Sequence, residues 1–264
     1  MIAGVLAGFL GALVGIGGGV ILVPLLNGVM GLPFPEATAV SLVGVLGTSS
    51  SAVMTPPSRR LLNTRLAILL LLFSVTGAML GARVLTDISD DVKKSIFGVT
   101  AGVIAAMMFV RLNKRNVRPL STVNTGILGG QVYDDDLKTT VVYRVRRLPV
   151  AMVASFVAGI LSSLVGIGGG ILIVPVLNSL CGVPLRVAAA TSVLMIGVTA
   201  IPGVAAHWAG GYLNDFHLAA LATVGTVVGF QIGQFAGPRA PVLWLKATMG
   251  VILTGVALQY LLFR

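Results

Sequence analysis

Residues 14–41 read VGIGGGVILVPLLNGVMGLPFPEATAVS, and residues 165–192 read VGIGGGILIVPVLNSLCGVPLRVAAATS. The two stretches align without a gap at an offset of 151 (165 minus 14), and 15 of the 28 aligned positions are identical. Each contains three consecutive glycines, a Val-Pro pair and an asparagine at matching positions. An apolar composition alone does not preserve such prolines and asparagines, so the chain is predicted to contain two homologous repeats.

The composition indicates where these repeats lie. Of the 264 residues, 56% are hydrophobic and only 10% are charged, and the mean hydropathy is +1.01. A soluble domain carries roughly 25% charged residues, and charge-free stretches such as 37–58 and 216–238 have the length of about 20 residues that spans a bilayer. We therefore expect an all-α polytopic protein of a prokaryotic plasma membrane, with a first transmembrane repeat at 1–110, a linker at 111–149 and a second repeat at 150–264.

The linker is the one polar region. It carries eight Lys or Arg against three consecutive acids, Asp134 to Asp136, and the positive-inside rule places such a segment in the cytosol. Two short segments, 131–133 and 140–146, flank the acidic turn, and the second alternates apolar and polar residues. This pattern predicts a small β-hairpin in the cytosol.

Each repeat opens with an uncharged run, 1–35 and 148–185, that is too long for one span. The glycine triplet lies near the middle of the run, where each glycine costs a helix about 1 kcal/mol relative to alanine. A Gly-broken helix or a helical hairpin is therefore predicted. If this element returns to its starting side, the repeats are inverted and 14 of the 18 Lys and Arg lie on the linker side; if it crosses, the repeats are parallel and 12 do. The inverted arrangement is favoured by this small margin, and both remain open.

The glycine breaks also indicate a binding site. Broken helices at membrane depth expose backbone amides and the positive end of a half-helix, which hold an anion without a buried cation. Hydroxyl residues recur in the next segment of both repeats, and an amide lies in a later apolar stretch. The candidate substrate-binding residues are Gly17, Gly18, Gly19, Ser41, Gly168, Gly169, Gly170, Thr191, Ser192 and Gln231.

Other small and polar residues have a structural interpretation. Glycines at every fourth position, in 225–237 and at Gly77 and Gly81, predict close helix packing and a possible homo-oligomer through these faces. Asn27 and Asn178 are expected to bond carbonyls freed by the nearby proline.

The ionisable residues argue against several classes of function. His207 and His217 flank a polar turn, so solvated loop histidines are expected and no metal site is predicted. All eight acids fall at segment ends or in the linker, so no carboxylate is placed to relay protons or sodium at mid-membrane. The basic residues form no patch on a soluble fold, which excludes nucleic acid, and Val20 replaces the last glycine of a dinucleotide motif. With the single Cys181 in an apolar run and no catalytic motif, neither a cofactor nor an enzyme is predicted.

These motifs resemble the TauE/SafE family of membrane permeases, the sulfite-exporter group. The family pattern is Gly-x-x-Gly-x-Gly-Gly-Gly, a hydrophobic run, Val-Pro, and a later Ala-x-x-x-Ser or Ala-x-x-Thr-Ser, in both halves. Here it lies at 15–24 with 37–41, and again at 166–175 with 190–192. The first copy departs from it, with Val40 where the second has Thr191. The resemblance covers nearly the whole chain, and the linker is similar to inserts in prokaryotic members.

The resemblance implies a secondary transporter for a small sulfur-containing anion, such as sulfite or an organosulfonate, held between the two broken helices. The expected partners are that anionic substrate and the lipid bilayer. Three alternatives stay open: a permease for another small anion such as a carboxylate, a passive anion channel and, least favoured, an intramembrane enzyme. A channel leaks anion without saturation or counterflow, whereas an enzyme needs a buried acid, base or nucleophile pair.

Overall fold

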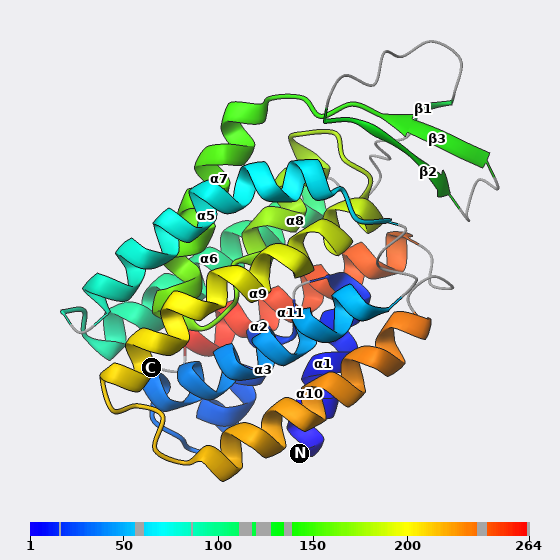
Figure 1. Cartoon of the computed structure of the whole chain (residues 1–264). Helices are drawn as coiled ribbons and strands as arrows, with labels where there is room; N and C mark the ends of the chain where they lie inside the picture. The colour runs from blue at the N-terminus through cyan, green and yellow to red at the C-terminus, as the bar shows by residue number, and fades with distance from the viewer. Residues whose placement is uncertain are drawn as a thin grey trace.

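The chain folds into a helical bundle with a small sheet at one end (Figure 1). The computed structural model describes residues 1–15, 17–55, 61–85, 87–110, 118–119, 128–134, 139–236 and 242–262. The first half forms α1 (Ile2–Val14), α2 (Gly19–Pro24), the π-helix η1 (Leu25–Val29), α3 (Phe34–Met54), α5 (Thr64–Val84) and α6 (Asp90–Val110). The strands are β1 (Arg118–Pro119), β2 (Gly130–Asp134) and β3 (Thr139–Tyr143), and the second half forms α7 (Leu148–Val165), α8 (Gly170–Ser179), α9 (Leu185–Ala209), α10 (Phe216–Ala236) and α11 (Val242–Leu262).

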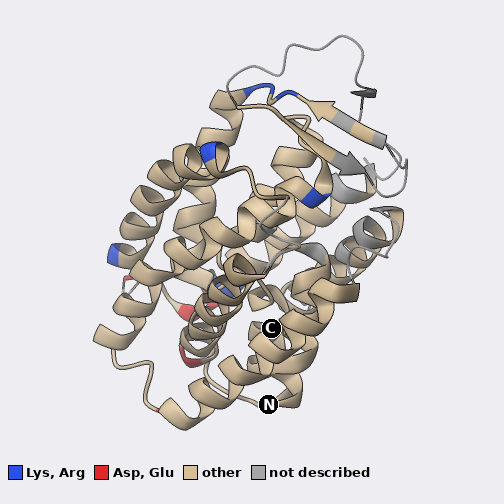
Figure 2. Ribbon diagram, turned by 45° about the vertical axis from the view of Figure 1, so that its right-hand side comes forward, with Lys and Arg blue, Asp and Glu red and all other residues tan. Residues whose placement is uncertain are grey.

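The helices have the length and hydropathy of membrane spans. Five of them, α3, α5, α7, α9 and α10, are long and apolar enough to cross a bilayer, which confirms the predicted helical polytopic class. Many apolar side chains on them point outward, as expected where lipid replaces water as the solvent. In Figure 2 the acidic residues that are drawn lie away from the sheet, whereas basic residues lie both beside the sheet and at the other end of the bundle.

The helices of one half pack against helices of the other. Helix α1 lies along α10 and α5 along α7, and both pairs are parallel: Gly4 lies against Ala222 and Gly8 against Thr226. The pairs α3 with α9 and α6 with α11 are antiparallel, because Leu42 lies against Gly203 whereas Ser49 bonds Val193. The core of the bundle therefore consists of contacts between the halves (Figure 1).

Glycine makes these contacts close. A Cβ on Gly77 would collide with the carbonyl oxygen of Phe156, and one on Gly229 with that of Val5. The fourth-position glycines thus pack helices together, as predicted. Both faces are covered inside the chain, by α7 and α1, so a homo-oligomer would use other surfaces.

The linker contains the predicted hairpin. Strands β2 and β3 are antiparallel, with Gly130 opposite Tyr143 and Asp134 opposite Thr139. The short strand β1, which the sequence did not predict, pairs with the other edge of β3. Val142 and Tyr143 are buried, so β3 anchors the sheet to the helices.

Two asparagines fix the ends of the half-helices. Asn27 Nδ2 donates to the carbonyl of Leu32 at 2.7 Å, and Asn178 Nδ2 donates to that of Val183 at 3.0 Å. The structural role is as predicted, but the carbonyls lie just before the next helix rather than beside Pro24 or Pro175. In the first repeat, Pro24 is followed directly by η1, because proline cannot supply an intrahelical hydrogen bond.

A first prediction concerns the α5–α7 contact. Replacing Gly77 by Ala puts a methyl group onto the Phe156 carbonyl and forces the helices apart, which should lower the free energy of unfolding by about 1 to 3 kcal/mol. Gly255→Ala is the control, since nothing lies within 4 Å of a Cβ at that position. Thermal unfolding in detergent checks this; equal melting temperatures for Gly77→Ala and Gly255→Ala would show that the contact is not close.

Candidate functional site

The glycine-rich segments form sharp turns between two half-helices. Helix α1 ends at Val14 and α2 begins at Gly19, and α7 ends at Val165 and α8 begins at Gly170. The turns therefore include Gly15, Gly17 and Gly18 in the first half and residues 166–169 in the second, so they begin two residues before the glycine triplets. Three glycines in each turn have φ between 72° and 84°, a conformation that disfavours side chains.

Each turn folds its half-helix back along the preceding helix. A Cβ on Gly18 would lie 2.8 Å from the carbonyl oxygen of Ala7, and one on Gly169 would lie 3.0 Å from that of Ala158. Of the two predicted possibilities, a broken helix or a helical hairpin, the structure has the hairpin.

The two turns meet inside the bundle, and we call this contact the glycine crossing. Gly19 lies against the carbonyl oxygen of Gly166, and both Gly17 and Gly168 face Val45 and Ile196. The residues in these contacts are uncharged. The crossing is thus an embedded, cation-free place where backbone groups from both halves lie close together.

Two serines stabilise the glycine crossing, and each bonds a glycine carbonyl in the other half of the chain. Ser41 Oγ on α3 donates to the carbonyl of Gly166 at 2.9 Å, and Ser192 Oγ on α9 donates to that of Gly15 at 2.7 Å. Each serine therefore satisfies a carbonyl that the turn in the other half of the chain has freed. Thr48 Oγ1 adds a bond of 3.1 Å to the carbonyl of Gly17. Because a serine has one proton to donate, Ser41 and Ser192 use theirs on the backbone.

Two further hydroxyls at the crossing have no partner. Thr38 and Ser162 are fully buried, and neither side-chain oxygen has a hydrogen bond among the described residues. Thr38 packs against Gly166. Ser162 lies one helical turn after Ala158, on the face of α7 that meets Gly169 at the start of α8. An unsatisfied buried hydroxyl costs about 1 to 3 kcal/mol, so an acceptor placed here gains that energy.

The other predicted residues lie elsewhere. Gln231 on α10 is exposed, and its Nε2 donates to Ser51 Oγ at 3.3 Å, near the sheet end of α3. Thr191 Oγ1 accepts the backbone N–H of Asn63 at 3.2 Å. The structure thus brings together the glycines, Ser41 and Ser192, but not Gln231.

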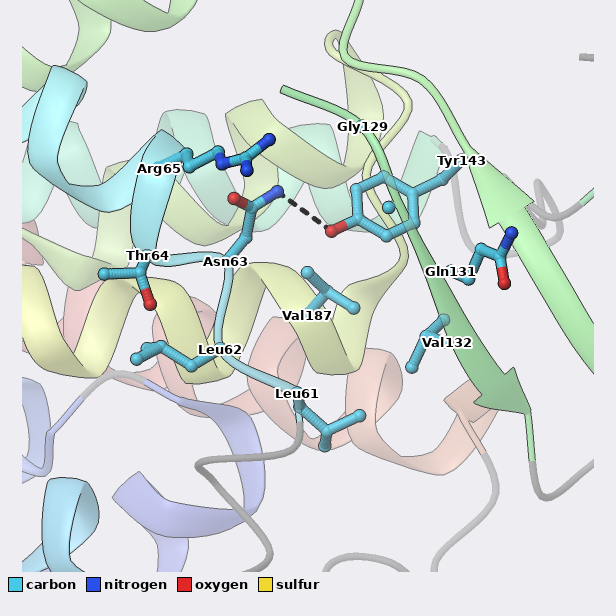
Figure 3. Close-up of a pocket in the computed structure, with 11 residues that line it drawn as sticks. Leu61, Leu62, Asn63, Thr64, Arg65, Gly129, Gln131, Val132, Tyr143 and Val187 are labelled. Carbon is cyan, nitrogen blue, oxygen red and sulfur yellow. Dashed lines mark hydrogen bonds between the residues drawn. The ribbon is translucent and has the colours of Figure 1, made fainter. Parts of the chain in front are cut away.

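A second polar site is an open cavity of about 320 Å³ between the start of α5 and the sheet (Figure 3). Asn63, the N-cap of α5, donates through Nδ2 to the Tyr143 hydroxyl at 2.9 Å and to the carbonyl of Leu128 at 2.8 Å. Burial raises the pKa of Tyr143 above its usual value of 10, so its hydroxyl stays neutral at physiological pH. The lining residues are Leu61, Leu62, Asn63, Thr64, Arg65, Gly129, Gly130, Gln131, Val132, Tyr143 and Val187.

The cavity and the crossing are connected through the backbone. Asn63 lines the cavity and bonds Thr191, and the next residue, Ser192, holds the Gly15 carbonyl. Asn63, which lines the cavity, is therefore bonded to the residue next in sequence to Ser192, a serine of the crossing.

Comparison with known proteins places this architecture in a family. The family model described as "Sulfite exporter TauE/SafE" matches residues 1–260. The chain belongs to the TauE/SafE family. As a TauE/SafE protein it is a multi-pass membrane transporter of the cell membrane, and its relatives are named as transporters rather than enzymes.

Three relatives illustrate the range of this TauE/SafE match. The probable membrane transporter protein YunE of Bacillus subtilis is 27% identical over 98% of this chain and 95% of its own length. The probable membrane transporter protein MJ0441 of Methanocaldococcus jannaschii is 24% identical over 96% and 92%. Sulfite exporter TauE/SafE family protein 5 of Arabidopsis thaliana is 32% identical over 42% of this chain and 25% of its own. No solved structure matches.

The unpartnered hydroxyls escaped the sequence analysis for a clear reason. Under the repeat offset of 151, Thr38 aligns with Ala189 and Ser162 aligns with Gly11. Neither belongs to the doubled pattern on which the TauE/SafE resemblance depends. Each of these hydroxyls occurs in only one of the two aligned halves. A pattern of residues shared by both halves therefore does not include them.

A second prediction tests the link between sheet and helices. Tyr143→Phe removes the acceptor for Asn63 and should cost about 0.5 to 1.5 kcal/mol locally, which corresponds to roughly two- to tenfold faster amide exchange in β3. Gln131→Ala, an exposed residue of the same cavity, is the control. Hydrogen–deuterium exchange with mass spectrometry measures both; unchanged exchange in Tyr143→Phe would mean that the hydrogen bond does not hold the sheet.

Proposed function

We propose that this TauE/SafE transporter is a secondary carrier of a small anion, sulfite or an organosulfonate, which binds at the glycine crossing. The relatives carry generic transporter names, so the substrate class rests on the family description and on the chemistry of the crossing. The observation that carries the proposal is the pair of buried, unpartnered hydroxyls, Thr38 and Ser162, beside the glycine turn that starts α8.

The donors at this place suit an oxyanion. Both free hydroxyls can donate to a sulfur-bound oxygen, and the first N–H groups of α8 have no intrahelical acceptor. A helix N-terminus contributes roughly 0.3 to 1 kcal/mol toward an anion, and up to about 2 when partly buried. In this proposal Gly168, Gly169 and Gly170 present their amides, whereas Gly17, Gly18 and Gly19 pack from the other side. Binding without a buried cation is weak and reversible, as a carrier requires.

Ser41, Thr191 and Ser192 take a positioning role in this proposal. Their recorded hydrogen bonds go to the backbone, so they fix the two turns relative to each other rather than hold the anion. Gln231 has no part in the binding site, because it bonds Ser51 at the sheet end.

We further propose that the two repeats have opposite orientations in the membrane. The antiparallel pairs support this: α3 aligns in sequence with α9, and the two run in opposite directions. The hairpin form of the glycine elements also supports it. If each hairpin returns to its starting side, three further helices of each half cross the membrane: α3, α5 and α6 in the first half and α9, α10 and α11 in the second. With the basic linker in the cytosol, the sheet and its cavity form the cytosolic entrance to the crossing.

A third prediction tests this orientation by labelling. Thr140→Cys puts a thiol on the exposed side of β3, and an impermeant maleimide should label it in inside-out vesicles but not in intact cells. The native Cys181 is buried, and burial raises the pKa of its thiol to about 11, so it should stay unlabelled and needs no removal. Labelling from outside intact cells would place the sheet outside and reverse the arrangement.

A fourth prediction tests transport. Proteoliposomes loaded with unlabelled sulfite should take up radiolabelled sulfite by counterflow, with sulfate, taurine and acetate as competitors. Saturable counterflow distinguishes a carrier from a channel, and stronger competition by acetate than by sulfonates would favour the carboxylate alternative. Failure of every anion to exchange would contradict the carrier.

Two variants locate the site in the same assay. Ser162→Ala removes one hydrogen bond worth about 0.5 to 1.5 kcal/mol and should weaken apparent affinity roughly two- to tenfold. Gly169→Val should abolish transport, because a side chain is strained at φ 72° and blocks the approach of the backbone. Thr76→Ala is the control, since that exposed hydroxyl bonds only within its own helix. Wild-type kinetics in Ser162→Ala would move the site away from the crossing.

A further inference from the structure

His207 is buried, in contrast to the solvated loop histidine that the sequence predicts. It lies in the last turn of α9 and is 1% exposed. Its Nδ1 bonds the carbonyl of Gly203 at 2.9 Å, and since a carbonyl only accepts, Nδ1 carries the proton. Nε2 therefore carries the free lone pair of the ring, and it is buried without a partner among the described residues.

A second buried ionisable residue lies near His207. Lys93 on α6 is 2% exposed and forms an ion pair of 3.2 Å with Asp90. It lies close enough to act electrostatically on His207, and the ring of Tyr212 covers the imidazole edge-on at 6.1 Å between centroids. Ionisable side chains buried in a membrane domain are costly and mark functional sites.

Among the described residues, neither of the two ion pairs, Lys93–Asp90 and Lys94–Asp91, includes His207. Helices α3, α5, α7 and α8 pack against α9. Of these, α7 and α8 carry no charged residue, while α3 contributes the half-buried Glu36 and α5 the exposed Arg83. Asp87, before α6, is exposed, and Asp90 is committed to Lys93.

Helix α9 contacts the glycine crossing through Ser192 and Ile196 and carries His207 further along, in its last turn. Gly203, one turn deeper, packs against Leu42 and Ser163. These two residues are the direct neighbours of Ser41, which holds the crossing, and of the unpartnered Ser162. Gly203, whose carbonyl bonds the imidazole, therefore packs on the chain segments that carry Ser41 and Ser162, at the end of the bundle opposite the sheet.

The geometry points to His207 Nε2 as the atom that binds a proton transported together with the anion, an inference that rests on the proposed function. The proton adds to the Nε2 lone pair and converts the imidazole to an imidazolium, while Nδ1–H keeps its bond to Gly203. That cation lacks a counter-charge until an anion reaches the crossing. By linkage, proton and anion each strengthen the binding of the other, so both bind and both leave together, and release of the proton restores the imidazole.

The experiment uses proteoliposomes with the membrane potential held at zero by potassium and valinomycin. Radiolabelled sulfite is added with the lumen one pH unit more alkaline than the outside. One proton per monovalent anion supports about a tenfold accumulation across one pH unit, since each unit is worth 1.36 kcal/mol. The variants are His207→Gln, whose amide can still donate to Gly203, and His217→Gln, a matched control at an exposed histidine. Protein-free liposomes correct for sulfite that crosses unaided.

Wild type and His217→Gln should accumulate sulfite about tenfold, whereas His207→Gln should exchange sulfite by counterflow and lose the accumulation. Accumulation by His207→Gln equal to that of wild type overturns the inference. A pH dye inside wild-type vesicles gives a readout that needs no variant: sulfite uptake without accompanying proton movement, while counterflow persists, also overturns it. Absence of counterflow in wild type overturns the proposed function instead, so the two failures are distinguishable.

Discussion

The exchanged pair of hydrogen bonds from Ser41 to Gly166 and from Ser192 to Gly15 is the interaction on which the rest of the bundle depends. A glycine turn at membrane depth frees carbonyls that no water can satisfy, and such backbone is tolerated only when protein satisfies it. At Gly166 and Gly15 the satisfying hydroxyl comes from the other half of the chain, and Thr48 adds a bond to Gly17 within the first half. The closure of each turn therefore depends on a serine of the other half.

The same pair connects the two ends of the molecule. Toward the sheet, Ser192 follows Thr191, which bonds Asn63 and through it the hydroxyl of Tyr143. Toward the opposite end, Ser41 precedes Leu42, which packs on Gly203 and thereby on the turn that holds His207. A movement of one half of the chain against the other that breaks either serine bond therefore changes the surroundings of the cavity beside the sheet, the crossing and the imidazole together. Such a coupled change is what alternating access needs.

The sequence predicts most of this fold because its strongest signals are local. Three adjacent glycines stop a helix wherever they lie, and the alternation around Val141 suffices for a hairpin, so both elements could be predicted from residue order alone. Partners in space could not be. Ser41 is predicted as a substrate-binding residue beside the glycines; in the structure it does contact a glycine turn, but that turn lies 125 residues away, and the proton of Ser41 goes to a carbonyl. Thr38 and Ser162 have no repeat counterparts, and the two-residue shift of the turns follows from Gly15 and Gly166 ending their helices.

His207 shows why polarity near a turn is an uncertain guide in membrane proteins. Its neighbours Gly210 and Gly211 do form a turn, but α9 continues to Ala209, and the bond from Nδ1 to Gly203 keeps the ring on the buried side of its last turn. Gln231 illustrates the opposite case. Its apolar surroundings in sequence suggest burial, whereas its position on α10 leaves it exposed beside Ser51.

The most direct test of the account is to locate the bound anion. Selenite, the heavier analogue of sulfite, can be soaked into crystals of the protein and located by its anomalous scattering. An anomalous peak is expected at the glycine crossing, within hydrogen-bonding distance of the Ser162 and Thr38 hydroxyls and of the first amides of α8. A peak confined to the cavity beside Arg65, with the crossing empty and its serine bonds intact, would show that the anion does not bind at the crossing.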